Sequence, residues 1–298
     1  MSESARNTDF AGADDVQRRL GSVDYLADHR TATAVYLAAE LGKPILVEGP
    51  AGTGKTELAK SFARMTGAEL IRLQCYEGLD ESKALYEWNY RKQLLALSDR
   101  REDGGEGLDD AGIFGPEYLL ERPILAALRA EKPVVLLIDE IDRIDFETEA
   151  LLLEALSEFQ VTVPELGTIR ARHRPMVFLT SNGTRDLSEA VKRRCLFLFL
   201  GHPSAERERA IIEARVPGIA RELGEQISMV VQSLRMLDLK KRPSVSETLD
   251  WARTLRLLEV ETVDAACVVD TLNVLLKDQS DVDKAEAALA ASTPLVGA

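Results

Sequence analysis

The chain of 298 residues has a composition typical of globular proteins, with 45% hydrophobic and 29% charged residues, and is long enough for one large domain or a large and a small one. Its formal net charge of −13, from 37 basic and 50 acidic residues, disfavours non-specific nucleic-acid binding because a polyanion is repelled. No apolar run reaches the roughly 18 residues of a membrane span. The three cysteines lie too far apart for a disulfide framework or a zinc site. We therefore expect a cytoplasmic protein with protein partners, no nucleic acid and no stable membrane insertion.

The first part of the chain is predicted to alternate between helices and strands after a polar segment. Residues 1–19 contain little to bury and are expected to form a flexible N-terminal arm. Apolar positions then recur at helical spacing from Val23 to Leu41, and Gly42 ends that helix. The next elements are a strand over 43–49, a helix ended by Gly67, a strand over 69–75, a long helix over 81–100 and a Gly- and acid-rich loop over 102–112 that we interpret as mobile.

The middle of the chain contains the most apolar strand. A helix over 116–130 leads to PVVLLIDE, a near-continuous apolar run of the kind buried in parallel sheets. The following elements are a helix over 146–159, a hairpin insertion near 159–175, a strand over 175–182, a short helix and a strand over 195–200. This alternation predicts a doubly wound α/β nucleotide-binding domain with a parallel sheet over 20–202. The β signals stop there, and we expect a small all-α domain over 203–298.

The segment GPAGTGKT matches the phosphate-binding pattern G-x-x-x-x-G-K-[ST] in full, directly after a predicted strand and at the start of a predicted helix. Its glycines let backbone N–H groups curl around phosphates, and the helix N-terminus adds a positive dipole end. Lys55 is expected to reach the β- and γ-phosphates of ATP, and the Thr56 hydroxyl to bind Mg²⁺. The alternative is a Gly-rich turn that happens to hold Lys and Thr, which the strand and helix context disfavours. The expected nucleotide contacts are Gly49, Pro50, Ala51, Gly52, Thr53, Gly54, Lys55, Thr56 and Glu57.

Two acidic residues, Asp139 and Glu140, come at the carboxyl end of the most apolar strand, where open α/β sheets bind ligands. Asp139 is expected to hold Mg²⁺ through its water shell, and Glu140 to orient and polarise the attacking water. The alternative is an ordinary acidic turn after a strand, but the pair follows five apolar residues in a chain that already has a phosphate loop. We interpret the nearby Asp142 and Asp145 as solvated or as caps of the next helix.

Polar and basic residues after the later strands are candidates for contact with the γ-phosphate. Asn182 ends an apolar strand and is expected to bond the γ-phosphate or the lytic water, with a helix cap or turn as the alternative. Arg193 and Arg194 end a short helix, where cations suit the helix dipole. The functional interpretation is that one of them is an arginine finger, which reaches the γ-phosphate bound by a neighbouring subunit. Such a finger raises the rate of hydrolysis by about 10³-fold or more.

Taken in this order, GPAGTGKT, LLIDE, TSN and VKRRC resemble the motifs of the AAA+ ATPases, and within them those of the MoxR group. Other stretches resemble the MoxR-like ATPases encoded with carbon monoxide dehydrogenase, the CoxD type. These stretches are YLADHRTATAVYLAAELGKPILVEGPAGTGKTELAK, CYEGLDESKALYEWNYRKQLL and KRPSVSETLDWARTL. The resemblance covers the chain from about Tyr25 to Leu258.

The resemblance implies an AAA+ core with strand order 5-1-4-3-2, a C-terminal helical lid and a homo-hexameric ring with ATP between subunits. It also implies a von Willebrand factor A-type partner and chaperone-like maturation of a metalloenzyme of the molybdenum hydroxylase or carbon monoxide dehydrogenase type. Carried over to this chain, Asn182 becomes sensor 1, and Arg194 or Arg193 becomes the finger, with Arg194 preferred. One departure is Ser246 at the position of a lid arginine that contacts the γ-phosphate in many relatives. Either Arg242 serves from a shifted position, or that contact is missing.

Two classes of function follow from these residues. The first is a mechanoenzyme in which ATP hydrolysis between subunits remodels a protein client. The second is a nucleotide-gated binding scaffold with little turnover, against which Glu140 argues because a pure switch needs no carboxylate to activate water. A small-molecule kinase would need an acceptor site, and a helicase loader is disfavoured by the charge of −13. Because one fold serves many functions, the remodelling activity is an expectation by analogy.

Overall fold

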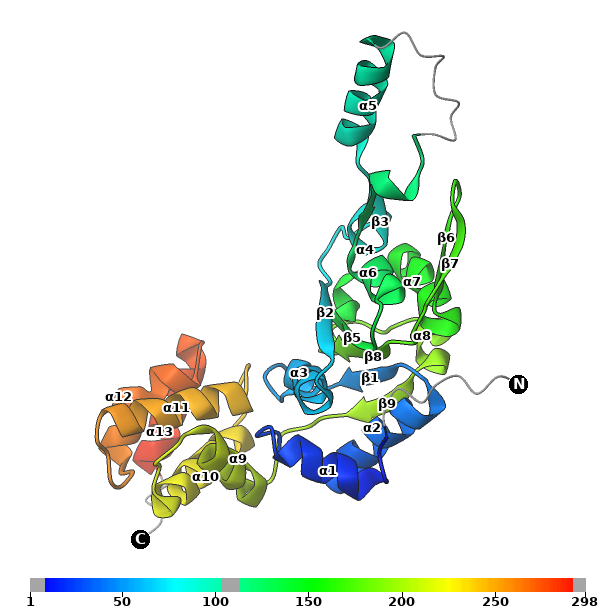
Figure 1. Cartoon of the computed structure of the whole chain (residues 1–298). Helices are drawn as coiled ribbons and strands as arrows, with labels where there is room; N and C mark the ends of the chain where they lie inside the picture. Colours follow the sequence, from blue (N-terminus) through cyan, green and yellow to red (C-terminus); the bar gives the residue numbers. More distant parts are fainter. Residues whose placement is uncertain (1–8, 103–112, 292–298) are drawn as a thin grey trace.

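A five-stranded parallel sheet forms the centre of the molecule in the computed structural model, which describes residues 9–102 and 113–291. The strands lie in the order β2-β5-β8-β1-β9 (Figure 1). Counted along the chain within this sheet, that order is 2-3-4-1-5, so the expected order 5-1-4-3-2 is confirmed. The strands are β1 Ile45–Glu48, β2 Glu69–Gln74, β5 Val134–Asp139, β8 Met176–Ser181 and β9 Leu196–Phe199.

Helices cover both faces of this sheet because the central strands are apolar on both sides. Along β1, Ile45 and Val47 enter one core and Leu46 enters the other, as successive side chains of a strand must. The first core lies under α2 and α3, and the second lies under α6, α7 and α8 (Figure 1). These helices are α2 His29–Leu41, α3 Lys55–Thr66, α6 Pro123–Arg129, α7 Phe146–Glu158 and α8 Glu189–Arg194.

The N-terminal segment corrects one expectation. The flexible arm predicted over 1–19 is wrong for residues 9–19, because α1 (Ala13–Gly21) buries Val16 and Leu20 against the first core; residues 1–8 lie outside the described part. Phe10 packs edge-on against Phe62 of α3, with ring centroids 5.9 Å apart. The helix expected from position 23 begins later, at α2, because Asp28 caps it by accepting the backbone N–H of Thr31 at 2.8 Å.

The long helix predicted over 81–100 is also wrong, as is the single helix over 116–130. The first segment divides into α4 (Glu81–Ala84), β3 (Tyr86–Trp88) and α5 (Tyr90–Glu102). The second divides into the 3₁₀ turn η2 (Pro116–Tyr118), β4 (Leu119–Glu121) and α6. Strands β3 and β4 pair antiparallel, and Trp88 packs against Phe114, so a tertiary contact overrides local helix propensity. Figure 1 shows β3 and α5 projecting from the sheet. Of the loop interpreted as mobile, residues 103–112 lie outside the described part.

A β-hairpin comes before β8. It consists of β6 (Gln160–Val163) and β7 (Gly167–Arg170), which pair antiparallel within the stretch where the insertion was expected. Phe159 precedes it in the left-handed region (φ 51°), which turns the chain out of α7 and into β6.

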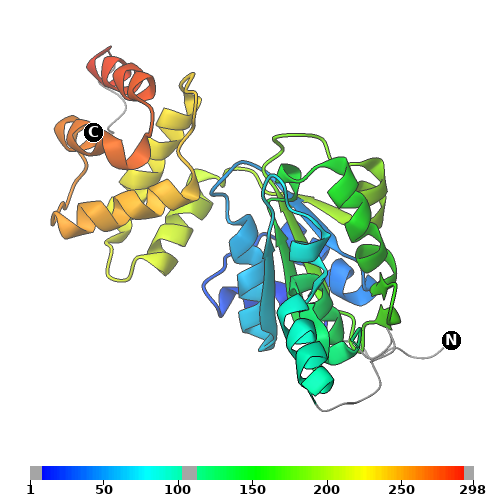
Figure 2. The same ribbon diagram turned by 90° about the horizontal axis from the view of Figure 1, so that it is seen from above.

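The C-terminal helices have a hydrophobic core of their own, set apart from the sheet (Figures 1 and 2). Trp251 is fully buried there, and its indole N–H donates to the Thr271 hydroxyl at 2.8 Å. No helix within 9–102 and 113–291 is both long and apolar enough to cross a membrane. The helices are α9 Ala205–Arg215, α10 Arg221–Met236, α11 Val245–Leu257, α12 Ala265–Leu275 and α13 Gln279–Ala291.

A buried ion pair joins α9 and α10 inside this helical group. Glu208 is fully buried and accepts two hydrogen bonds from the Arg235 guanidinium, at 2.6 and 2.7 Å. The Thr248 hydroxyl also donates to Glu208, and Arg235 donates to the Pro243 carbonyl. This network therefore fixes α9, α10 and the start of α11 relative to one another.

We predict that Arg235→Met lowers the free energy of unfolding of the helical group by about 3–5 kcal/mol, because it leaves Glu208 charged, buried and unpaired. Urea unfolding followed by the fluorescence of Trp251, in a Trp88→Phe background, measures the change. The double variant Glu208→Gln/Arg235→Met should recover part of the loss, since neither charge is then stranded. An unfolding midpoint equal to that of the parent would contradict the prediction.

Candidate functional site

The phosphate loop, residues 49–56, follows β1 and ends in the first turn of α3. Gly49 (φ 155°) passes so close to β9 that a Cβ would lie 2.0 Å from the Leu200 carbonyl oxygen. Gly52 (φ 73°) approaches the start of α11, where a Cβ would lie 2.1 Å from Ser244 Oγ. The N-terminus of α3 has no side-chain cap, so its first N–H groups are available to an anion. The backbone of this loop therefore needs glycine at these positions and presents donors to a phosphate.

Lys55 is buried, and its side chain bonds back to the start of the loop. Its ammonium group donates to the carbonyls of Gly49 (2.8 Å) and Pro50 (2.7 Å) and to Asn182 Oδ1 (2.9 Å). Burial lowers the pKa of Lys55, although nearby carboxylates, Asp142 first among them, act in the opposite direction. The structure thus brings Lys55 and Asn182 into direct contact across 127 residues of sequence.

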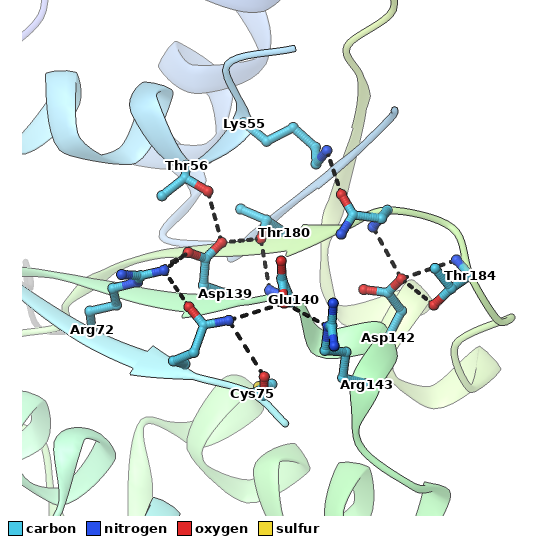
Figure 3. Close-up of polar contacts among 12 residues, drawn as sticks. Lys55, Thr56, Arg72, Cys75, Asp139, Glu140, Asp142, Arg143, Thr180 and Thr184 are labelled. Atoms are coloured by element: carbon cyan, nitrogen blue, oxygen red, sulfur yellow. Dashed lines mark hydrogen bonds and ion pairs between the residues drawn. The ribbon is translucent and has the colours of Figure 1, made fainter. Parts of the chain in front are cut away.

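Asp139 lies at the carboxyl end of β5 and is only 2% exposed. One carboxylate oxygen accepts from the Thr56 hydroxyl at 2.9 Å and from the Thr180 hydroxyl, while the other accepts from Arg72 Nε at 3.0 Å (Figure 3). Sequence reasoning missed Arg72. It faces Asp139 because β2 and β5 are neighbours in register, a pairing that no local pattern of the sequence indicates.

Glu140 follows in the left-handed backbone region (φ 57°, ψ 48°), which turns its side chain away from that of Asp139. Its backbone N–H donates to Thr180 Oγ1 at 2.9 Å. Its carboxylate accepts from Gln74 Nε2 at 3.2 Å and pairs with Arg143 Nε at 2.6 Å (Figure 3). Glu140 is therefore held between β2 and the turn η3 (Ile141–Arg143), and Gln74 is a second residue of this site that sequence reasoning missed.

Asp142 is buried, contrary to the interpretation that it is solvated. One oxygen accepts the backbone N–H groups of Asn182 (3.2 Å) and Thr184 (3.0 Å) and the Thr184 hydroxyl (2.6 Å). Burial raises its pKa, but these hydrogen bonds outweigh burial and hold the pKa below its usual value. Asp145 does cap the next helix, by accepting the backbone N–H of Thr148 at 2.7 Å.

The arginines predicted to act at the γ-phosphate lie apart from these groups. Arg193 is 82% exposed and pairs with Glu189 at 4.0 Å. Arg194 donates to the Ala190 carbonyl at 2.9 Å and to the Ser157 hydroxyl. Arg242 is exposed and does not line the cleft described next, so its role as a nucleotide contact stays a prediction.

A cleft of about 280 Å³ lies beside the phosphate loop, between the chain before α2, the end of β9 and the C-terminal helices. Tyr25 lies in it against Gly54, with its hydroxyl 3.5 Å from that carbonyl oxygen. Its walls are apolar as well as polar, as a base and a sugar require. Residues lining it include Asp24, Tyr25, Gly52, Thr53, Gly54, Glu57, Phe199, His202, Arg207 and Ser246.

Two ion pairs connect α9 to the rest of this cleft. Arg207 donates to Asp28 (2.8 Å) and to the Leu26 carbonyl (2.9 Å). Arg215 pairs with Glu57 at 3.3 Å. Burial raises the pKa of Glu57, but the bond and charge of Arg64 and the charge of Arg215 together lower it. Glu57 thus lines the cleft with its carboxylate already paired, and its role as a nucleotide contact stays a prediction.

The residues present fit Mg²⁺ with a nucleoside triphosphate. Thr56 Oγ1 and Asp139 Oδ1 lie 2.9 Å apart and are hard oxygen ligands of the kind that Mg²⁺ prefers. Within the described ranges, no three His, Cys, Asp or Glu side chains gather to hold a metal by themselves. Water and phosphate oxygens must therefore complete the coordination, as they commonly do for Mg²⁺.

The segment that carries these groups matches a known family. Residues 44–195, about half of the chain, match the AAA domain of the dynein-related subfamily. The chain belongs to this family. Membership accounts for a nucleotide-dependent activity in general, whereas the MoxR-like, CoxD-type branch stays a prediction from the sequence.

This AAA protein is similar to curated proteins of different lengths. It is 26% identical to a Lon protease of Heliobacterium modesticaldum over 79% of this chain and 27% of that protein. It is 29% identical to the uncharacterized protein YeaC of Bacillus subtilis over 70% of this chain and 62% of that protein. The chain thus spans about a quarter of the first and less than two thirds of the second. A solved structure of the Thermotoga maritima RuvB Holliday junction branch migration motor matches with a TM-score of 0.47 at 18% identity over 91% of this chain and 74% of that one.

We predict that Gly52→Ala lowers the affinity of this AAA protein for ATP by about tenfold or more, equivalent to about 1.4 kcal/mol. The new Cβ would overlap Ser244 Oγ and force the loop or α11 to shift. Equilibrium binding of a fluorescent ATP analogue measures the affinity. Gly67→Ala is the matched control, since Gly67 has a similar φ (69°) and open space around it. Equal losses in both variants would mean that backbone strain alone is responsible.

Proposed function

We propose that this chain hydrolyses ATP with Mg²⁺ between the subunits of an AAA+ ring. The observation that carries the proposal is the meeting of Lys55, Thr56, Asp139 and Asn182 at the carboxyl edge of the sheet, with Glu140 next in the chain. These groups bind phosphates, hold a hard cation and polarise water, which are the parts that phosphoryl transfer to water needs.

Each residue has one task in this proposal. Lys55 neutralises the β- and γ-phosphates, and the N–H groups at the start of α3 hold their oxygens. Thr56 and Asp139 would hold Mg²⁺, which when bound neutralises charge on the phosphates. Glu140 accepts a proton from water, and Asn182 orients that water or the γ-phosphate.

The position of the two arginines supports the proposed ring. Neither Arg193 nor Arg194 lines the cleft of its own chain. AAA+ proteins typically form rings, and in this proposal one of the two arginines of α8 reaches the γ-phosphate bound by a neighbouring subunit. A hexamer is the expected assembly.

The client and partner are proposed from resemblance to the CoxD type over Tyr25 to Leu258. The ring would act as a chaperone in the maturation of a metalloenzyme of the molybdenum hydroxylase or carbon monoxide dehydrogenase type, together with a von Willebrand factor A-type partner.

A nucleotide-gated scaffold with little turnover is the second candidate. The observation in its favour is the ion pair between Glu140 and Arg143, together with the bond from Gln74. Both contacts are made to Oε2 and hold the carboxylate toward β2 and η3, so the arrangement suits a state in which hydrolysis waits for a partner.

We predict that Glu140→Gln lowers kcat about 10²-fold or more, because the amide cannot accept the proton from water, while ATP binding persists. Steady-state phosphate release and equilibrium binding measure the two effects. Light scattering with and without ATP gives the mass. Unchanged turnover in the variant would overturn hydrolysis at this site and favour the scaffold.

We predict that Arg194→Ala lowers kcat on the order of 10³-fold at retained ATP affinity and retained ring mass. Arg193→Ala, one residue away on the same helix, is the matched comparison and decides which arginine is the finger. If both variants hydrolyse ATP like the parent at every protein concentration, no finger acts in trans.

A further inference from the structure

The helix that carries both candidate fingers depends on neighbouring elements for its position. Helix α8 has only six residues, Glu189–Arg194, and one fully buried side chain, Val191. A helix of this length is not stable by itself in water. Its contacts with α7 and β9 therefore decide where its arginines lie.

Glu149 of α7 provides the contact at the start of α8. It is 1% exposed, and its Oε2 accepts the backbone N–H of Ser188, the N-cap of α8, at 2.9 Å. Its Oε1 accepts from Arg185, whose guanidinium also donates to the Ile144 carbonyl and stacks on Phe146 at 4.7 Å. A buried carboxylate with both oxygens bonded defines one position for the chain over 185–188.

The other end of α8 is joined to the same helix. Arg194 donates to the hydroxyl of Ser157, near the end of α7. Upstream, Asp142 holds the backbone of Asn182 and Thr184. The chain from Asn182 to Ser188 is therefore attached at both ends to the segment that directly follows Glu140. The contact of Arg194 with Ser157, in contrast, is one that a finger at Arg194 would leave to reach a neighbouring phosphate.

We propose that Glu149 is a positioning residue that sets the arginine finger of α8 for the active site of the neighbouring subunit, and not for its own. This inference rests on the proposed ring mechanism. Glu149 has no contact with the phosphate loop or with Asp139 and Glu140 among its hydrogen bonds within the described residues. Its effect on hydrolysis therefore passes through Arg185 and Ser188 to the chain they belong to, which ends in α8.

A carboxylate is required at this position because two donors meet there. The amide of glutamine offers one acceptor oxygen, so its NH₂ group would face either the Ser188 N–H or the Arg185 guanidinium. Glu149→Gln therefore loses one contact while keeping nearly the same volume. The expected result is a displaced α8 in a folded subunit.

We predict that Glu149→Gln lowers kcat by about 10- to 100-fold with KM for ATP within about twofold, because a misplaced catalytic group of this kind costs on the order of 10²-fold. Steady-state hydrolysis measures both constants. Glu147→Gln is the matched control: it is an exposed residue on the first turn of the same helix and loses the same charge. The control is expected to hydrolyse ATP like the parent.

A mixing experiment tests whether the defect lies in trans. Glu149→Gln subunits keep an intact cleft and lack a placed finger, whereas Glu140→Gln subunits keep the finger and lack the base. In an equal mixture, half of the clefts belong to Glu149→Gln subunits and therefore keep Glu140. Half of these clefts adjoin a Glu140→Gln subunit, which supplies a placed finger. About a quarter of parental activity is therefore expected, above that of either variant alone. A mixture no more active than its parts overturns the inference.

The same mixture made with Arg194→Ala in place of Glu149→Gln separates this failure from that of the ring mechanism. If mixing with Glu140→Gln restores hydrolysis to Arg194→Ala but not to Glu149→Gln, the role of Glu149 is rejected and catalysis in trans is retained. If mixing restores hydrolysis to neither variant, both the role of Glu149 and catalysis in trans are rejected. Should Glu149→Gln fail to fold, Arg185→Lys, which keeps the charge but not the paired geometry, is mixed in its place and judged by the same result.

Discussion

The buried carboxylate of Asp139 is the interaction on which the site depends. Removing an ionised carboxylate from water is unfavourable unless hydrogen bonds and an opposite charge replace its hydration. Here the replacements come from α3, β8 and β2, through Thr56, Thr180 and Arg72. The same contacts therefore fix the phosphate loop, the strand before Asn182 and the outer strand in one arrangement. The contacts that satisfy the buried Asp139 carboxylate therefore also position the residues expected to bind Mg²⁺ and phosphate.

Much of the core site could be predicted from the sequence because its motifs are contiguous. The phosphate loop, the acidic pair and Asn182 each follow an apolar strand, and the carboxyl ends of parallel strands meet at one edge. Arg72 and Gln74 could not be found this way, since their partners lie 67 and 66 residues away and become neighbours only through the pairing of β2 with β5. The expected order 5-1-4-3-2 puts the second strand of the sheet beside the third, but it does not give the register that brings Arg72 and Gln74 to Asp139 and Glu140.

The secondary-structure predictions that were wrong also share one physical reason. Residues 81–100 contain good helix formers, yet β3 forms because β4, more than 30 residues later, supplies its partner. The N-terminal segment looks polar, yet Phe10, Val16 and Leu20 are spaced to cover the first core. In both cases a few distant apolar contacts outweigh local propensity, which is a weak guide where tertiary packing decides.

The C-terminal helices are held differently within their own group and toward the sheet. Within the group they are held together by the buried Glu208–Arg235 pair and by a hydrophobic core around Trp251. Toward the sheet they are held by partly exposed pairs, Arg207 with Asp28 and Arg215 with Glu57, and such pairs are individually weak and sensitive to salt. The chain after β9 and these ion pairs are therefore where a change of angle between the two parts costs least. A nucleotide bound in the cleft would contact both parts and would add contacts between them.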